Sequence, residues 1–181
     1  NNRHGRPGFL QVLQQLAGVW KSQRAEVDSS ADHIHQQLSA FASQGEPGKS
    51  LPGSDALDRA AALLKNHFDP RHGGFGNAPK FPQPSQPRFL LSYAEARGDS
   101  EARRMVLQTC DRMAAGGIND QLGGGFSRYS VDAEWLVPHF EKMLYDNAQL
   151  VQLYLDAFLA SGQTRYAETV RQIIQYVLRD M

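Results

Sequence analysis

Apolar residues recur at intervals of three and four along most of this chain, the spacing that gathers them on one side of an α-helix. No run of alternating β-branched residues is long enough to predict an extended strand. The 181 residues are enough to bury a hydrophobic core. We therefore predict an all-α protein.

Two helices are expected before a linker. The first spans about 7–24, and the second follows a cap cluster at 28–30. The apolar residues that the second helix should bury are Ile34, Leu38 and Phe41. The stretch 45–53 (GEPGKSLPG) is rich in glycine and proline, which is typical of a linker. The expected parts of the chain are therefore 1–44, the linker 45–53, and 54–181.

Beyond the linker, the expected helices alternate between one apolar side and two. They cover about 54–67, 85–96, 100–115, 140–160 and 164–179. The 100–115 helix has one stripe, made of Ala102, Met105, Val106, Thr109, Cys110 and Met113. The 140–160 helix carries Leu144, Ala148, Val151, Leu155 and Phe158 on one side and Met143, Leu150, Tyr154 and Ala157 on another. Because a helix with two apolar sides is an interior helix, the predicted order is outer, inner, outer, inner, outer.

The connections between these helices are unequal in length. The joints at 97–99 and 161–163 are tight, so each joins two antiparallel neighbours. The loops 68–84 and 116–138 are long, and hairpin geometry places both on the rim above the N-termini of the inner helices. Each contains GGF followed by P-x-F, a repeat typical of helical-repeat folds. Between Phe126 and Pro138 the second loop is compatible with a small β-hairpin. Antiparallel hairpins in this order predict an α/α toroid, a barrel of helical hairpins.

Polar and aromatic side chains concentrate on the second long loop and at the expected start of the 140–160 helix. Carboxylates, an imidazole, aromatic rings and an amide are groups that hold sugar hydroxyls, stack on a pyranose face and move protons. The predicted catalytic residues are His139, Glu141 and Asp146, and the predicted substrate-binding residues are Asp120, Arg128, Trp135, Tyr145 and Asn147. The positive end of the helix is expected to lower the pKa of a neighbouring carboxyl.

Some of these residues also have a purely structural interpretation. Glu141 can complement the helix dipole, His139 can hydrogen-bond a loop carbonyl, and Trp135 can anchor the loop.

Other chemistry has less support in the sequence. On the first long loop, Asp69, His72 and Lys80 are expected to form turn and cap bonds. Positions 139 and 141 diverge on a helix, which does not favour a metal site. The GGGF motif lacks the strand and the spacing of a nucleotide-binding loop. We therefore predict neither a metal nor a cofactor.

Overall charge and cysteine content restrict the partners. Nineteen basic and nineteen acidic residues give zero net charge, so no field attracts nucleic acid or an anionic membrane surface. The lone Cys110 excludes an internal disulfide within this chain and is expected to be a small buried residue. No signal segment is present, and no segment approaches the ~20 apolar residues that span a bilayer. We expect a soluble, cytoplasmic protein.

Two stretches, 68–84 (FDPRHGGFGNAPKFPQP) and 116–150 (GGINDQLGGGFSRYSVDAEWLVPHFEKMLYDNAQL), resemble the spermatogenesis-associated thioredoxin-like protein family. Residues 5–20 (GRPGFLQVLQQLAGVW) resemble the last helix of that family's thioredoxin-like domain. The resemblance implies that 1–44 is this helix plus a connecting helix. It also implies that 54–181 begins a six-hairpin toroid similar to N-acylglucosamine 2-epimerase and to six-hairpin glycosidases. Both domains are then incomplete in this chain.

The leading functional hypothesis is a segment of a carbohydrate-processing protein, an epimerase, isomerase or glycoside hydrolase, that is inactive alone. The alternative is a non-enzymatic module whose rim docks a protein, with a redox-associated or scaffold role for the thioredoxin-like part. Expected partners are a carbohydrate, the remainder of the parent chain, and a second copy of this chain, because an incomplete toroid exposes apolar helix faces.

Overall fold

The computed structural model of the protein describes residues 7–43 and 53–181. Within these ranges it contains seven α-helices, and the only β pairing consists of isolated antiparallel bridges. The all-α prediction is therefore confirmed. The chain divides into two units, Asn1–Pro52 and Gly53–Met181. The predicted linker 45–53, apart from Gly53, lies outside the described residues. No helix of the described part is both long and apolar enough to cross a membrane.

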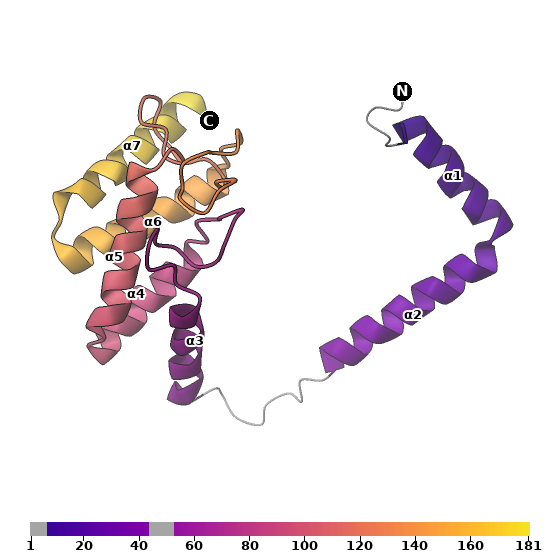
Figure 1. Cartoon of the computed structure of the whole chain (residues 1–181), viewed down its shortest axis with the longest axis horizontal. Helices are drawn as coiled ribbons and strands as arrows, with labels where there is room; N and C mark the ends of the chain where they lie inside the picture. Colours follow the sequence, from indigo (N-terminus) through magenta and orange to yellow (C-terminus); the bar gives the residue numbers. More distant parts are fainter. Residues whose placement is uncertain (1–6, 44–52) are drawn as a thin grey trace. The chain divides into compact units, whose positions relative to one another are not determined.

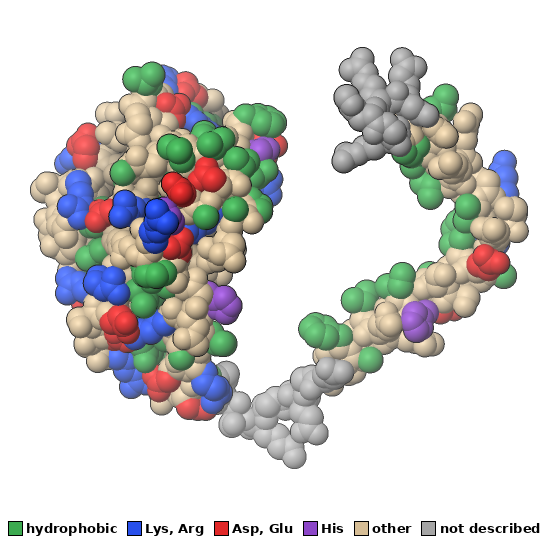
Figure 2. Space-filling view, viewed as in Figure 1, with side chains coloured by type: hydrophobic (Ala, Val, Ile, Leu, Met, Phe, Trp, Pro, Cys, Tyr) green, Lys and Arg blue, Asp and Glu red, His purple; other side chains and the backbone are tan. Residues whose placement is uncertain are grey.

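The first unit consists of α1 (Phe9–Ser22) and α2 (Arg24–Ser43), which meet at Gln23 (Figure 1). The predicted start of the second helix at 28–30 is wrong, because Asp28 lies inside α2 and pairs with Arg24 one turn earlier. The predicted burial is also wrong, since neither helix has a buried residue and Ile34, Leu38 and Phe41 are all exposed. Two helices alone have no second layer to cover their apolar sides, which Figure 2 shows at the surface.

The second unit is built from two helical hairpins and one further helix. The hairpins are α4 (Ser85–Arg97) with α5 (Ser100–Ala115), and α6 (Leu144–Ser161) with α7 (Thr164–Asp180). The inner helices α4 and α6 also pack against each other, and α3 (Ser54–Asn66) packs on α4 (Figure 1). This arrangement is the predicted succession of outer and inner helices.

Both tight joints are confirmed. Gly98 and Gly162 end α4 and α6 in the left-handed conformation, with φ of 66° and 69°. Asp99 then caps α5, because its carboxylate accepts a hydrogen bond from the backbone N–H of Ala102. After each inner helix the chain therefore reverses direction at once and continues as the neighbouring outer helix.

The core confirms the predicted stripe of α5. All six of its predicted apolar positions are buried, including Cys110, which is fully enclosed and whose thiol pKa burial raises. On α6 only one of the two predicted sides is buried, around Leu150, Tyr154 and Ala157. Leu144 and Leu155 on the other side are 53% and 43% exposed. Within the described residues, α6 is contacted by α4, α5 and α7, and these helices cover only its buried side.

The two long loops meet at one rim, as predicted. Lys80 and Ser130 exchange both backbone hydrogen bonds, at 2.8 and 3.0 Å. The small β-hairpin is not formed as two strands, since Ser130 pairs singly with Lys80 on one side and Pro138 on the other. The second loop is also longer than predicted: α6 begins at Leu144 instead of residue 140, because the backbone of His139 is bonded to Tyr129 in an extended pairing.

Replacement of Gly125 by alanine should destabilise the second unit. Gly125 has a φ of 76°, and an added Cβ would come within 2.3 Å of the Tyr176 ring. Gly98 has a similar φ of 66° but open space around it. We expect Gly98→Ala to cost about 1–2 kcal/mol of unfolding free energy, and Gly125→Ala about 2–5 kcal/mol because the steric clash adds to the backbone strain. Urea denaturation measures both values, and equal losses would contradict the steric account.

Candidate functional site

Two buried side chains hold the rim loops together. The ammonium of Lys80, which is only 1% exposed, donates to the Asp69 carboxylate at 2.6 Å and to the carbonyl of Ala133 at 2.9 Å. Trp135 has no exposed surface, and its indole N–H donates to the carbonyl of His72 at 3.0 Å. Both contacts join the first loop to the second. The expected turn bonds are confirmed for Asp69, whose carboxylate accepts from the backbone N–H groups of Arg71 and His72, whereas Lys80 joins the two loops instead of closing a turn or a cap. The structure supports the loop-anchor interpretation of Trp135 over a role in substrate binding, because its ring has no accessible face.

Asn147 likewise acts inside the protein. Its buried amide accepts from the backbone N–H of Phe126 at 2.8 Å and donates to the carbonyls of Phe126 and Met143, each at 3.0 Å. The side chain thus clamps the glycine loop onto the first turn of α6. With all three bonds satisfied and no exposed surface, Asn147 has no polar atom left for the predicted contact with a substrate.

The two glycine loops share a hydrogen-bonding motif, of which the sequence repeat indicated only the GGF part. In each, an aspartate carboxylate accepts backbone N–H bonds from the residues two and three positions later, Arg71 and His72 for Asp69 and Leu122 and Gly123 for Asp120. A lysine then closes each loop, Lys80 on Asp69 at 2.6 Å and Lys142 on Asp120 at 2.7 Å. The repeated motif is therefore D-x-x-x-G-G-F, with the aspartate four residues before the first glycine. The P-x-F repeat had aligned Lys80 with His139, whereas the structural equivalent of Lys80 is Lys142.

Arg128, His139 and Glu141 form a partly exposed polar cluster on the rim. A guanidinium nitrogen of Arg128 and Nδ1 of His139 lie 3.4 and 3.6 Å from the same carboxylate oxygen of Glu141. The backbone N–H of Arg128 also donates to the carbonyl of Glu141. Because Glu141 lies three residues before α6, the interpretation that it complements the helix dipole from the first turn is wrong. Its ion pair and its loop position bring it to His139 instead.

A row of rings in contact crosses from the first loop to this cluster, with Tyr129 and His139 stacked and the outer two pairs tilted. The ring centres of Phe81 and Tyr129 are 4.7 Å apart, those of Tyr129 and His139 are 4.4 Å apart, and those of His139 and Phe140 are 4.6 Å apart. Phe140, at the end of the row, is 86% exposed. The sequence indicated that Phe81 and Phe140 belong to a repeat, but it did not indicate that their rings lie in one row with Tyr129 and His139.

Asp146 occupies the first turn of α6 and has an unusual environment. Its Oδ2 is the one buried side-chain polar atom without a hydrogen-bond partner in the described part of the chain. Burial raises the pKa of the Asp146 carboxyl, and the positive charge of Arg128 only partly opposes this. The net direction at Asp146 is therefore opposite to the lowering that the helix end was expected to cause. The neighbouring Tyr145 is 49% exposed.

The hollows in the surface do not coincide with this cluster. Asp120 lines a hollow of about 130 Å³ between the second loop and α7, and a larger groove of about 620 Å³ follows α5. Neither is lined by Arg128, His139 or Asp146. Across the described ranges no three His, Cys, Asp or Glu side chains are grouped so that they could hold a metal ion.

Comparison with known proteins identifies relatives of this chain. No family model matches the chain. It is 40% identical to human spermatogenesis-associated protein 20 and 39% identical to the mouse protein, each over 182 residues and 97% of this chain. The chain is homologous to one segment of spermatogenesis-associated protein 20. The resemblance seen in 68–84 and 116–150 is thereby confirmed.

The homology covers only part of the relatives. This chain spans 23% of the human and mouse spermatogenesis-associated protein 20 sequences. An uncharacterized protein of Caenorhabditis elegans is 36% identical over 160 residues, which are 86% of this chain and 22% of that protein. The name of spermatogenesis-associated protein 20 states no activity for this segment.

The fold is shared with a solved enzyme. The cellobiose 2-epimerase of Spirochaeta thermophila matches 78% of this chain and 40% of its own, with a TM-score of 0.59 and 20% identity. At that identity the likeness shows the fold alone. It confirms the predicted α/α toroid architecture for this homologue of spermatogenesis-associated protein 20.

Asp120→Asn should lower stability in a pH-dependent way. The hydrogen bond from Lys142, with those from the backbone of Gly123 and Leu122, lowers the pKa of Asp120 to about 2. Because the folded-state pKa lies below the usual 3.8, the stabilisation is present above about pH 4 and is lost as the pH falls towards 2. We expect a loss of about 1 kcal/mol at pH 7, since the carboxyl is 39% exposed and solvent screens it. Urea denaturation from pH 7 to pH 2.5 measures the difference, and a difference of constant size at every pH would contradict the ion-pair account.

Asp146→Asn should raise the stability of the fold at pH 7, the opposite of the effect expected for Asp120→Asn. The raised pKa of Asp146 means that ionisation costs the folded state free energy above that pKa, and that the cost disappears below the unfolded value near 3.8. The variant should therefore melt at a higher temperature than the parent at pH 7 and at the same temperature below about pH 3.5. Thermal melts at both pH values measure this. A lower melting temperature at pH 7 would show that the Asp146 carboxylate has a stabilising partner.

Proposed function

We propose that this segment supplies part of the ligand-binding rim of a carbohydrate-processing protein, an epimerase, isomerase or glycoside hydrolase. The observation that carries the proposal is the unpaired, buried carboxyl oxygen of Asp146. Nearly all buried polar atoms have a partner, so one left without is a cost that a binding or catalytic role explains. It lies at the start of an inner helix, on the rim where both long loops converge.

The roles follow from the contacts. Asp146, with its raised pKa, is suited to hold or transfer a proton, and the His139–Glu141 pair is suited to a second proton transfer. Arg128 and Tyr145 present exposed donors for sugar hydroxyls. The exposed ring of Phe140 offers an apolar face for a pyranose, a role that the buried Trp135 cannot take. Asp120, Trp135 and Asn147 support the loops that carry these groups.

The remaining parts of the protein enter the proposal through the family. We propose that 1–44 ends a thioredoxin-like domain and that the remainder of the parent chain completes the toroid. The exposed side of α6, around Leu144 and Leu155, is where further inner helices would pack. The isolated segment should then be inactive and should self-associate through this side. A location in the cytoplasm fits a single, buried cysteine.

Calorimetric titration of the full-length parent with a panel of mono- and disaccharides tests the proposal. We expect at least one sugar to bind with a Kd of about 1 μM to 1 mM, the usual range of enzyme substrates. Asp146→Ala should weaken that binding about tenfold or more, because a charged hydrogen bond is lost. Glu168→Gln on the outer helix α7, whose carboxylate is exposed, is the matched control and should bind as the parent does. No heat with any sugar would contradict the proposal.

A docking module is the second candidate, favoured by the apolar residues exposed on the rim. Leu122 is fully exposed and Leu136 is 63% exposed, and exposed apolar groups of this kind mark protein interfaces. A double change, Leu122→Asp with Leu136→Asp, separates the two candidates in the same titration. If the rim only docks a protein, these changes abolish capture of the partner and no sugar binds; if it binds carbohydrate, the sugar heat survives them.

A further inference from the structure

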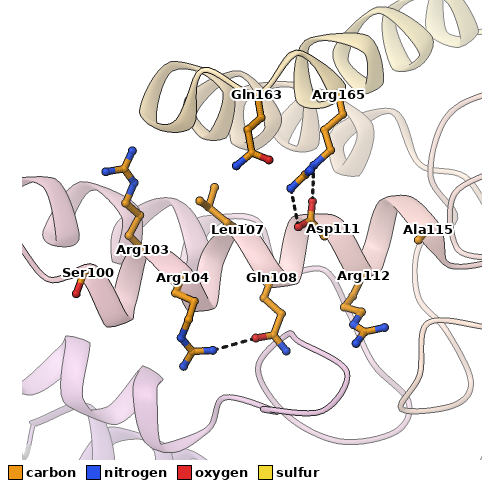
Figure 3. A pocket seen from close by; sticks show the side chains of 10 residues that line it. All are labelled: Ser100, Arg103, Arg104, Leu107, Gln108, Asp111, Arg112, Ala115, Gln163 and Arg165. Carbon is orange, nitrogen blue, oxygen red and sulfur yellow. Dashed lines mark hydrogen bonds and ion pairs between the residues drawn. The ribbon is translucent and has the colours of Figure 1, made fainter.

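A second surface, which Arg128, His139 and Glu141 do not line, follows the outer helix α5. It is a groove of about 620 Å³ between α5 and the start of α7 (Figure 3). The side chains that give it its character are Arg103, Arg104, Asp111 and Arg112 from α5 and Arg165 from α7. Neither the rim hypothesis nor the family resemblance assigns a role to this groove.

The groove carries a local excess of positive charge. It is lined by four guanidinium groups and one carboxylate, although the whole chain has zero net charge. Arg165 uses that carboxylate, at 2.9 Å from Asp111, and Arg103 lies 3.7 Å from Glu95 outside the groove. Among the residues that the structure describes, Arg104 and Arg112 have no carboxylate partner, and both are exposed. These two side chains remain available to an anionic partner.

Helix geometry sets the two arginines in line. Arg104, Gln108 and Arg112 are spaced four residues apart, and Figure 3 shows them on the same side of α5, opposite the side from which Asp111 reaches Arg165. A Gln108 amide oxygen accepts from Arg104 at 3.1 Å, and its amide nitrogen donates to the carbonyl of Pro70 at 2.8 Å, so the middle of the row is fixed. Eight residues at ~1.5 Å per residue separate the arginines by about 12 Å along the helix axis. An extended peptide, at ~3.3 Å per residue, covers this distance with about four residues.

We propose that this groove binds an acidic peptide segment, an extended run of about four to six residues rich in Asp and Glu. Guanidinium groups match carboxylates in geometry as well as charge, and a row of two binds carboxylates spaced along a chain better than a single small anion. Single-stranded nucleic acid fits less well, because no aromatic ring lines the groove for bases to stack on. This inference goes beyond the carbohydrate proposal and does not depend on it.

Fluorescence anisotropy with the full 181-residue chain tests it. The probe is a fluorescein-labelled hexaglutamate peptide in low-salt buffer at pH 7, and the reference peptide is hexaglutamine. We expect saturable binding of hexaglutamate alone, weakened severalfold when the salt rises from 50 to 200 mM, because exposed charges are screened. The double variant Arg104→Glu with Arg112→Glu should bind at least ~10-fold more weakly.

A charge-matched variant separates the groove from the net charge of the protein. Arg59→Glu with Arg171→Glu makes the same change in charge at two exposed arginines on α3 and α7 that do not line the groove. It should keep most of the binding. Equal weakening by both double variants would overturn the proposal, because binding would then follow net charge alone. Tighter binding of a labelled oligouridylate than of hexaglutamate, or no saturable binding of either, would also overturn it.

Discussion

The rim of this protein depends on the buried ammonium of Lys80. An unpaired charge inside a protein costs several kcal/mol, so a lysine that is 1% exposed requires a counter-ion and hydrogen-bond acceptors. It finds Asp69 within its own loop and the carbonyl of Ala133 in the other, beside the Trp135 ring. Removing the Asp69 carboxylate would leave the charge without its counter-ion. The two loops are therefore held in one relative position, which also fixes the positions of the side chains that they carry.

Two aspartates of the second loop and α6, Asp120 and Asp146, have carboxyl pKa values that are shifted in opposite directions. Asp120 receives Lys142 and two backbone N–H groups, and its pKa falls to about 2. Asp146 loses hydration without gaining a partner, and its pKa rises. The first is a fully bonded loop closure, whereas the second retains an unmet demand for a proton or a donor. The functional proposal depends on Asp146 because a buried carboxyl oxygen without a partner is unusual in a folded protein.

The sequence led to much of the rim, and its errors have identifiable causes. The GGF repeat, the meeting of the two loops and the core stripe of α5 were predictable, because they depend on local glycine conformation and helical periodicity. The start of α6 was not predictable, since the stretch before Leu144 has helical composition but the backbone of His139 and Glu141 pairs with Tyr129 and Arg128. Trp135 and Asn147 look like ligand-binding residues in a polar stretch. Only their enclosure shows that they anchor loops instead.

What the sequence by itself determined is the set of helices, their alternation, and the glycines that turn the chain between them. These depend on propensities and spacings within a few residues of each position. Tertiary structure alone decided which acid is paired and which is left without a partner, and which arginines have no carboxylate beside them. Burial, hydrogen-bond partners and pKa depend on atoms that are tens of residues away along the chain, and no local pattern records those distances.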